Sequence, residues 1–513
     1  MGDAPLIVGV SGLRGIVGES LTPEVAVRYA GAFASWLWEQ KRLSERRTVY
    51  LARDGRRGGE ATAALVRGAL LASGCDVVDI GVATTPTAGA IMRFDGGDGC
   101  VIITASHNPA EWNGLKLLIP DRKIDQNDLA AMSTAEMEAF QESLIGPAAP
   151  NKATAEEIID RFEQGLAFWR SNERAGRLDL NSGATSRHVE MIVERTPGAG
   201  YWNPLPVRFR AVLDSVNCSG ADGAAGLIDR LGSSSVNLHG DGSGIFPHTP
   251  EPTAENLSGA GGLCDAVPGL KADVGFAQDP DADRLAIVDE KGRYIGEEYT
   301  LALCAESVLA AETERRRDEE TERPVLVANL STSRMIDDVA AQHGGRVVRT
   351  PVGEANVVEV MKKLKAEGQN VVLGGEGNGG VIWPEVVYVR DSLGSMALVL
   401  SLMARTGKTV SELVAQIDSY SPGGKGYAIV KRKVEIASKA DAQPAVDKVA
   451  KAFGGRADAT IDLQDGVRVD LPEQGVWVHV RASNTEPIMR LIAEAPTDEA
   501  AGSILAEVER AIG

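Results

Sequence analysis

Three aspartates alternate along one short segment of the chain, Asp279, Asp281 and Asp283. Carboxylates this close repel one another unless a cation lies between them, and a donor set of oxygens alone favours Mg²⁺ or Ca²⁺ over Zn²⁺. A calcium-binding EF-hand loop would also use Glu290, but Arg284 stands where that loop requires glycine. Mg²⁺ commonly keeps part of its coordination shell for phosphate oxygens. The segment therefore predicts a Mg²⁺ site that faces a phosphate, and a purely structural acidic turn is the alternative.

A serine, Ser106, follows the short apolar run Val101–Ile103. Ligands of α/β proteins gather at the carboxyl ends of parallel strands, so Ser106 is a candidate reactive group. The GxSxG elbow of the α/β-hydrolases is absent. We also expect the side chains of Ser106 and His107 to point apart because the two residues are adjacent, which disfavours a catalytic triad. A plain turn punctuated by Asn108-Pro109 is the alternative.

A glycine-rich segment, residues 375–380, carries Glu376 and Asn378. It fits the GxGxxG pattern after a strand, which is typical of dinucleotide-binding proteins. That pattern requires a helix immediately afterwards, whereas residues 381–384 are strand-like and end in proline. Recognition of hydroxyl groups on a polar ligand is therefore the favoured interpretation, and a nucleotide-binding oxidoreductase is the remote alternative.

A fourth segment near the C-terminus combines a guanidinium with small polar side chains. Its residues are Arg481, Ser483, Asn484 and Thr485. An arginine fork, hydroxyls and backbone N–H groups in one turn suit a phosphate group, although a plain capped turn has the same composition. A different candidate phosphate loop at residues 407–409 is not a Walker A motif, because Leu402 stands at the position of the required glycine.

Helix-like and strand-like segments alternate for most of the chain, which indicates an α/β fold. We expect helices from Thr22-Pro23 to about Lys41 and from Glu60 to about Ser73, the second ending at Gly74. Short apolar runs predict buried strands. These runs are residues 77–80, 101–103, 211–213, 285–288, 325–327 and 371–373.

Boundaries are indicated at the Pro-rich and Gly-rich segments. Residues 146–150 read as a linker before a helix that starts near Ala155, and Lys291-Gly292 reads as a turn between a strand and a helix. The segment after residues 421–424 has a βαββα-like pattern. The charged run 312–323 is expected to be an exposed helix end and loop. No short-period repeat is visible, but three α/β units of similar size are compatible with diverged structural repeats.

The composition excludes several classes of protein. The chain has 513 residues, which allows three or four domains at about 150 residues each. Its net charge of −19 argues against a nucleic-acid or anionic-membrane binder, so an anionic substrate needs a local basic pocket. No run of about 18 apolar residues and no signal peptide is visible, and the five scattered cysteines read as reduced, mostly buried thiols. We therefore expect a cytoplasmic protein.

Taken in order, the four segments resemble the loops of the α-D-phosphohexomutase superfamily. The matching motifs are TASHNP followed by NGLK (residues 104–109 and 113–116), DPDADR (279–284), the looser GEGNGG (375–380) and RASNTEP (481–487). Residues 11–15, 52–56 and 350–354 are similar to further loops that line the family's cleft. The resemblance implies three similar α/β domains with mixed sheets and a C-terminal α+β domain around a central cleft. The implied domains are residues 1–154, 155–294, 295–419 and 420–513.

The resemblance also implies roles for particular residues. Ser106 would be the phosphoserine, and its phosphate would share one Mg²⁺ per chain with Asp279, Asp281 and Asp283. The residues implied to stabilise charge, shuttle a proton or position the phosphoserine are Arg14, Lys116 and Arg284. Glu376 and Asn378 would bind sugar hydroxyls. The residues implied to bind the phosphate that does not react are Arg481, Ser483, Asn484 and Thr485.

The implied activity is interconversion of hexose or hexosamine 1-phosphates and 6-phosphates through a sugar 1,6-bisphosphate, which also serves as activator. Many family members have Ser and His where this chain has Asn378 and Gly380, so the general acid/base stays open. This variant favours a phosphoglucosamine mutase, and a phosphomannomutase/phosphoglucomutase is the alternative. A non-catalytic metal-binding scaffold would rest on the aspartate segment alone. The implied partner is a phosphosugar, without nucleic acid or membrane, for a monomer or homodimer.

Overall fold

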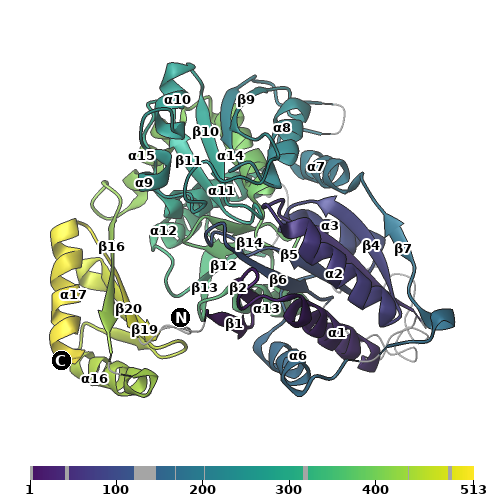
Figure 1. The fold of residues 1–513 in the computed structure, drawn as a ribbon. Helices are drawn as coiled ribbons and strands as arrows, with labels where there is room; N and C mark the ends of the chain where they lie inside the picture. The colour runs from purple at the N-terminus through teal and green to yellow at the C-terminus, as the bar shows by residue number, and fades with distance from the viewer. Residues whose placement is uncertain are drawn as a thin grey trace.

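The structure of the chain is a computed structural model that describes residues 4–40, 46–120, 146–167, 169–200, 203–315, 322–436, 438–482 and 488–512. Four β-sheets follow one another along the chain, each with its own helices. The first three sheets lie together, and the C-terminal one, yellow-green in Figure 1, stands to one side. None of the described helices combines the length and apolar character needed to cross a membrane.

The first sheet has seven strands in the order β1-β2-β6-β5-β3-β4-β7. Its strands are β1 (Leu6–Gly9), β2 (Gly12–Ile16), β3 (Arg47–Arg53), β4 (Cys75–Val82), β5 (Gly99–Ile103), β6 (Trp112–Leu118) and β7 (Leu178–Leu180). Its helices are α1 (Pro23–Glu39), α2 (Gly59–Ala72), α3 (Thr85–Asp95) and α6 (Lys152–Gln164). Helix α1 begins as predicted, with Thr22 accepting from the N–H of Val25 and Pro23 in the first turn.

Residues beyond 154 still belong to the first sheet. The backbone carbonyl of Phe162 in α6 accepts a hydrogen bond of 2.6 Å from Nε of Arg28 in α1. Strand β7 pairs in parallel with β4, and a short 3₁₀ helix, η1 (Asn172–Arg174), precedes it. The polypeptide therefore leaves the first sheet after residue 180, and the exact limits of the four domains stay a prediction.

The second and third sheets have four strands each. The second, in the order β11-β10-β8-β9, contains β8 (Arg210–Asp214), β9 (Ser234–His239), β10 (Val274–Gln278) and β11 (Leu285–Asp289), with α7 (Ala184–Arg195), α8 (Gly220–Arg230), α9 (Ala254–Leu257) and α10 (Leu263–Gly269). The third, in the order β13-β12-β14-β15, contains β12 (Val325–Asn329), β13 (Arg346–Thr350), β14 (Val371–Glu376) and β15 (Gly380–Ile382). Its helices are α11 (Glu297–Arg315), α12 (Met335–Gln342), α13 (Glu354–Ala366), α14 (Ser392–Thr406) and α15 (Val410–Tyr420).

The same strand arrangement occurs three times. In each of the sets β3–β6, β8–β11 and β12–β15, the first strand pairs in parallel with the second and third, and the fourth returns antiparallel to the third. The hairpin between the third and fourth strands carries Ser106 in the first set, the aspartates in the second and Glu376 with Asn378 in the third. The diverged structural repeat is therefore confirmed, and it places three candidate loops at equivalent carboxyl ends.

The C-terminal domain is an antiparallel sheet in the order β16-β20-β19-β18-β17. It contains β16 (Ala428–Glu435), α16 (Ala442–Gly454), β17 (Thr460–Asp462), β18 (Val467–Leu471), β19 (Val476–Ala482), β20 (Ile488–Ala495) and α17 (Asp498–Ile512), with short 3₁₀ helices η3 (Lys439–Asp441) and η4 (Pro472–Gln474). The βαββα pattern predicted from sequence is wrong in strand number, because four strands separate the two helices. The short strand β17 carries only partly buried and exposed residues, so it lacks the apolar signal of a core strand.

One continuous apolar core joins the first three domains. It contains, for example, Ile91 of α3, Ile192 of α7 and Leu398 of α14, all fully buried. The C-terminal domain has a separate core between its sheet and its two helices. Four of the cysteines are buried and Cys264 is partly buried, all as free thiols, as predicted. The first three domains therefore form a common platform, and the fourth packs against it through polar contacts.

Candidate active site

Ser106 lies at the start of the hairpin that follows β5, and its side chain is buried. Its backbone has a left-handed φ of 50°, which costs a non-glycine residue roughly 1–2 kcal/mol. Two contacts hold this conformation: the N–H of Ser106 donates to Oγ1 of Thr104 over 2.8 Å, and Nη2 of Arg56 donates to the Ser106 carbonyl over 2.5 Å. A strained, buried serine that is fixed on both sides is an arrangement found at functional sites.

The Ser106 hydroxyl connects the first domain to the second. Its Oγ donates a hydrogen bond of 2.9 Å to Oδ2 of Asp279. Nδ1 of His107 lies 3.3 Å from the same Oγ, so the expectation that these side chains point apart is wrong. The left-handed backbone at Ser106 turns both side chains to one side. Burial and the charges of Arg284 and Arg14 lower the pKa of His107 to about 3, so this imidazole is neutral at pH 7.

The three aspartates of the β10–β11 hairpin form one buried cluster. Each offers a carboxylate oxygen within 4.8 Å of the others, and all three side chains are fully buried. Oδ1 of Asp279 accepts from the N–H groups of Asp283 and Arg284 at 3.2 Å. Oδ1 of Asp281 and Oδ1 of Asp283 have no hydrogen-bond partner. Unpartnered buried carboxylate oxygens are costly, so the donor set fits a hard divalent cation.

Cationic side chains from two other domains reach this cluster. Nζ of Lys116, on β6, lies 2.7 Å from Oδ2 of Asp283 and 3.3 Å from Oδ2 of Asp281. Nη2 of Arg390 donates to Oδ2 of Asp283 over 2.6 Å. Oγ1 of Thr85 donates to Oδ2 of Asp281 over 2.7 Å. The cluster is therefore surrounded by positive charge and donors, as a phosphate-handling site requires.

The electrostatics of the three carboxylates differ. Burial, together with the charges of Asp283 and Asp281, raises the pKa of Asp279 well above its usual value. Burial also opposes ionisation of Asp283, but Arg390 and Lys116 outweigh it and hold the pKa of that carboxyl well below its usual range. Burial likewise opposes the charge of Lys116, and Asp283 and Asp281 nevertheless raise the pKa of its ammonium. Lys116 is therefore a permanent cation in this state.

Arg14 and Arg284 flank the serine loop. Nη1 of Arg14, on β2, donates to Oδ1 of Asn108 over 3.1 Å, and burial lowers the pKa of Arg14. Nη1 of Arg284 lies 3.9 Å from Oε1 of Glu251, and the buried Nε of Arg284 has no hydrogen-bond partner. Arg14 therefore contacts the serine loop directly, the charges of both guanidiniums act on His107 of that loop, and Nε of Arg284 is available to an anion.

The glycine-rich loop joins β14 to the antiparallel strand β15. No helix follows it, so the loop lacks the context of a dinucleotide-binding fingerprint. Gly379 has a left-handed φ of 81°, and its carbonyl accepts from the N–H of Leu285 over 3.0 Å. That contact fixes the glycine-rich loop beside the aspartate hairpin. The side chain of Asn378 is partly exposed, and its Oδ1 accepts from the N–H of Gly380.

Glu376 is buried and its carboxylate is engaged on both oxygens. Oε1 accepts from Nδ2 of Asn329 at 2.8 Å and from the N–H of Gly353 at 3.1 Å. Oε2 accepts from Nη1 of Arg390 at 2.8 Å. Arg390 therefore bridges Glu376 in the third domain and Asp283 in the second, and it couples the glycine-rich loop to the aspartate cluster.

Arg481 lies at the end of β19, next to the third domain. Its Nε is 3.0 Å from Oδ2 of Asp465, and the same Oδ2 accepts from the N–H of Val352 over 3.1 Å. Val352 belongs to the 350–354 segment that also holds Glu376. Arg481 therefore lies where the C-terminal domain contacts the 350–354 segment of the third domain. The other three residues expected in this loop, Ser483, Asn484 and Thr485, lie outside the described residues.

Sequence reasoning missed two groups at the site. Arg390 follows a run of apolar residues with no recognisable motif, and its partners lie 14 or more positions away. Thr85 has no sequence signal that points to the site. The only available signal was an arginine directly after the buried run 386–389, since an arginine among core residues needs a buried partner.

Comparison with known families agrees with this architecture. Four descriptions of phosphoglucomutase/phosphomannomutase domains match in order: alpha/beta/alpha domain I over residues 5–138, domain II over 187–292, domain III over 297–420 and the C-terminal domain over 430–511. Together they cover most of the chain. The aspartate cluster and the serine loop fall inside the second and first of these domains.

Individual relatives match along nearly the whole chain. A phosphoglucomutase/phosphomannomutase of Thermococcus kodakarensis is 34% identical and covers 97% of this chain and 96% of its own. A probable phosphoglucosamine mutase of Methanopyrus kandleri is also 34% identical, covering 96% and 94%. A solved phosphoglucomutase/phosphomannomutase family protein of Burkholderia thailandensis superposes with a TM-score of 0.73 at 25% identity, covering 99% and 98%. The chain therefore belongs to the phosphoglucomutase/phosphomannomutase family of α-D-phosphohexomutases and is a phosphohexomutase.

Proposed function

We propose that this enzyme interconverts glucosamine 1-phosphate and 6-phosphate, with Ser106 carrying the phosphoryl group between the two positions. The observation that carries the proposal is the 2.9 Å contact between the Ser106 hydroxyl and Asp279. It places a strained serine directly against three buried carboxylates, two of which have an unpartnered oxygen. A phosphorylated Ser106 and a cation held by those oxygens satisfy both features.

Mg²⁺ is the proposed ion, one per chain, held by Asp279, Asp281 and Asp283 with an oxygen of the Ser106 phosphate. When bound, it neutralises charge on the phosphoryl oxygens. The protein supplies the remaining cations. Lys116 already points its ammonium into the cluster, Arg14 contacts Asn108 of the serine loop, and Arg284 pairs with Asp283 of the aspartate hairpin. Phosphoryl transfer depends mainly on alignment and on charge at the equatorial oxygens, and these three side chains serve both needs.

The sugar is proposed to lie between the serine loop and the third domain. Glu376 and Asn378 would face its hydroxyls, and the non-reacting phosphate would bind Arg481 with Ser483, Asn484 and Thr485. Arg481 at present pairs with Asp465, so phosphate binding exchanges one anionic partner for another. One distal phosphate site can hold either end of a 1,6-bisphosphate, which explains why the bisphosphate would turn around between the half-reactions and why a trace of it would act as activator.

The amino-sugar preference rests on residue 378 and on relatives named phosphoglucosamine mutase at 30–34% identity. A second candidate, phosphomannomutase/phosphoglucomutase, is favoured by an equally similar relative with that name. We also propose a cytoplasmic location, which agrees with five unpaired thiols. The proposed oligomeric state is a monomer or a homodimer.

The experiment is phosphorus NMR of the purified protein with Mg²⁺ and a trace of hexose 1,6-bisphosphate. Glucosamine 1-phosphate, mannose 1-phosphate and glucose 1-phosphate are offered in separate tubes. The proposal predicts the fastest conversion to the 6-phosphate for glucosamine 1-phosphate. Faster conversion of the mannose or glucose ester would instead establish the second candidate. Residual turnover in Ser106→Ala would contradict the assignment of the serine, and circular dichroism of that variant controls for folding.

A further inference from the structure

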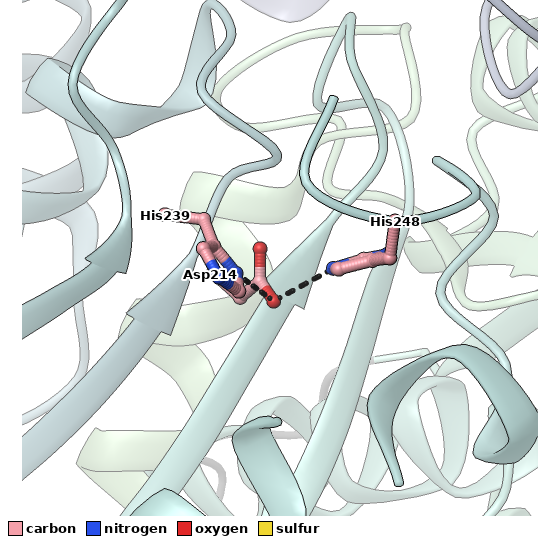
Figure 2. Close-up of side chains that lie close together, drawn as sticks. All are labelled: Asp214, His239 and His248. Atoms are coloured by element: carbon pink, nitrogen blue, oxygen red, sulfur yellow. Dashed lines mark hydrogen bonds and ion pairs between the residues drawn. The ribbon is translucent and has the colours of Figure 1, made fainter. Parts of the chain in front are cut away.

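A second cluster of metal-ligating side chains lies in the second domain, separate from the aspartate hairpin. It consists of Asp214, His239 and His248 (Figure 2). Nδ1 of His239 and Nε2 of His248 each lie 2.9 Å from the same oxygen, Oδ2 of Asp214. All three ligand atoms lie within 4.8 Å of one another. None of these residues contributes to the phosphate chemistry described above.

The fold brings the three residues together from distant positions. Asp214 ends β8 and His239 ends the neighbouring parallel strand β9, so both lie at the carboxyl edge of the second sheet. His248 reaches them from the loop that follows β9. Asp214 is 1% exposed, and its Oδ1 accepts from the N–H of Val216. The carboxylate is thereby held in one orientation, with Oδ2 aimed at the two imidazoles.

The orientation of His248 points to a cation. Its Nδ1 lies 2.8 Å from the carbonyl of Thr249 and can only donate there. In the neutral imidazole, Nε2 then carries a lone pair directed at Oδ2 of Asp214, which is also an acceptor. Either a proton, which makes the ring an imidazolium, or a metal ion therefore lies between these two atoms. A backbone carbonyl that fixes the far nitrogen is the usual second contact of a histidine that binds a metal.

We propose that Asp214, His239 and His248 bind a divalent transition-metal ion of the Zn²⁺ class. Two imidazole nitrogens and one carboxylate oxygen are a common three-residue donor set for such an ion, and water completes the tetrahedron. Bonds of about 2.0–2.1 Å place tetrahedral ligands about 3.3 Å apart, so side-chain adjustments suffice from the present separations. The imidazole side chains are 24% and 19% exposed, which gives an ion access from solvent. Mg²⁺ prefers oxygen donors and does not suit this set.

The ion would fix the conformation of the loop between His239 and His248, which contacts residues that hold Ser106. Between His239 and His248, the carbonyl of Gly244 accepts from the N–H of Arg57 over 3.1 Å, and the ring of Phe246 lies 5.4 Å below the Arg56 guanidinium. Arg56 in turn holds the Ser106 carbonyl. The site is therefore structural in character, and the inference does not depend on the proposed substrate or on phosphorylation of Ser106.

The test is equilibrium dialysis of the full-length protein against Zn²⁺ with Mg²⁺ in large excess, followed by metal analysis. We expect one zinc per chain, retained in Asp281→Asn, because that variant alters only the other site. His248→Gln is predicted to weaken zinc binding by more than about 100-fold, since loss of a ligand exceeds the 10–100-fold effect of an outer contact. His343→Gln is the matched control. It removes a partly buried histidine that contacts Glu306 elsewhere and should leave binding unchanged.

Wild-type protein alone provides a second readout. Co²⁺ bound in place of zinc is predicted to give the intense visible absorption of four-coordinate cobalt, and crystals soaked in zinc should show an anomalous peak between the two imidazoles. Absence of saturable zinc binding in the presence of Mg²⁺ would overturn the proposal, as would unchanged binding in His248→Gln. Either result would mean that a proton, and not a metal ion, occupies the space between Asp214 and His248.

Discussion

Nζ of Lys116 lies 2.7 Å from Oδ2 of Asp283, joining the last strand of the first repeat to the aspartate hairpin of the second. Both side chains are almost completely buried. A buried ion pair contributes little net stability, because desolvation offsets the attraction. We therefore propose a functional reason for this buried ion pair, which is that the lysine holds positive charge where the phosphoryl oxygens are proposed to lie.

Lys116→Met is predicted to lower kcat by at least about 100-fold, as expected when a positioned cation is removed from a developing charge. Asp283 keeps its contact with Arg390, so the protein should still fold. Steady-state kinetics with circular dichroism provide the measurement. Lys291→Met, at a mostly exposed lysine, is the control and should keep wild-type activity. Near-normal kcat in Lys116→Met would contradict the role of this lysine.

Asp281→Asn is predicted to lose most activity, with little recovery in excess Mg²⁺. The substitution replaces an unpartnered, fully buried carboxylate oxygen by a neutral group, and a hard cation binds amide oxygens more weakly than carboxylates. The measurement is activity over a Mg²⁺ titration. Asp229→Asn, at an exposed aspartate of α8, serves as control. Full rescue at high Mg²⁺ would show that Asp281 does not contact the ion.

Much of this architecture could be predicted from local sequence. The apolar runs at 101–103, 285–288 and 371–373 are buried strands, and each adjoins a loop of the candidate site. Buried strands can be predicted from continuous runs of apolar residues. The threefold structural repeat is compatible with the sequence, but only the pairing of the strands reveals it. The three units have the same topology without a visible repeat in their sequences.

The rest depended on contacts that no local pattern encodes. Arg390 bridges two carboxylates from different domains, and the four residues before it are ordinary core residues. The prediction that the side chains of Ser106 and His107 point apart is wrong. It holds for extended backbone, whereas Ser106 has a left-handed φ of 50°. The cluster of Asp214, His239 and His248 likewise has no local sequence signal, since the two histidines lie 25 and 34 positions after Asp214.

Acid is predicted to destabilise the docking of the C-terminal domain. On β19, Nε2 of His479 donates to the Asp465 carbonyl, and Nδ1 contacts the Ser331 hydroxyl of the third domain at 2.8 Å. Burial lowers the pKa of His479 to about 4, against about 6.5 in an unfolded chain. Between these values the unfolded state binds the extra proton, so stability falls as pH drops from about 6.5 towards 4.

The loss attributable to this histidine is up to about 3 kcal/mol. Denaturant unfolding of the wild type and of His479→Gln across this pH range measures it. The variant is predicted to lose stability less steeply on acidification. Parallel pH profiles of the two proteins would contradict a neutral, buried His479.

Whether Ser106 carries the phosphoryl group is tested most directly by mass spectrometry of the purified protein after incubation with a hexose 1,6-bisphosphate and Mg²⁺. We expect one added phosphoryl group per chain, located on the peptide that contains Ser106, and its transfer to added hexose monophosphate at a rate consistent with turnover. A phosphoryl group on another residue, or a Ser106 phosphate that persists unchanged while substrate turns over, would contradict the role of Ser106 as the phosphoryl carrier.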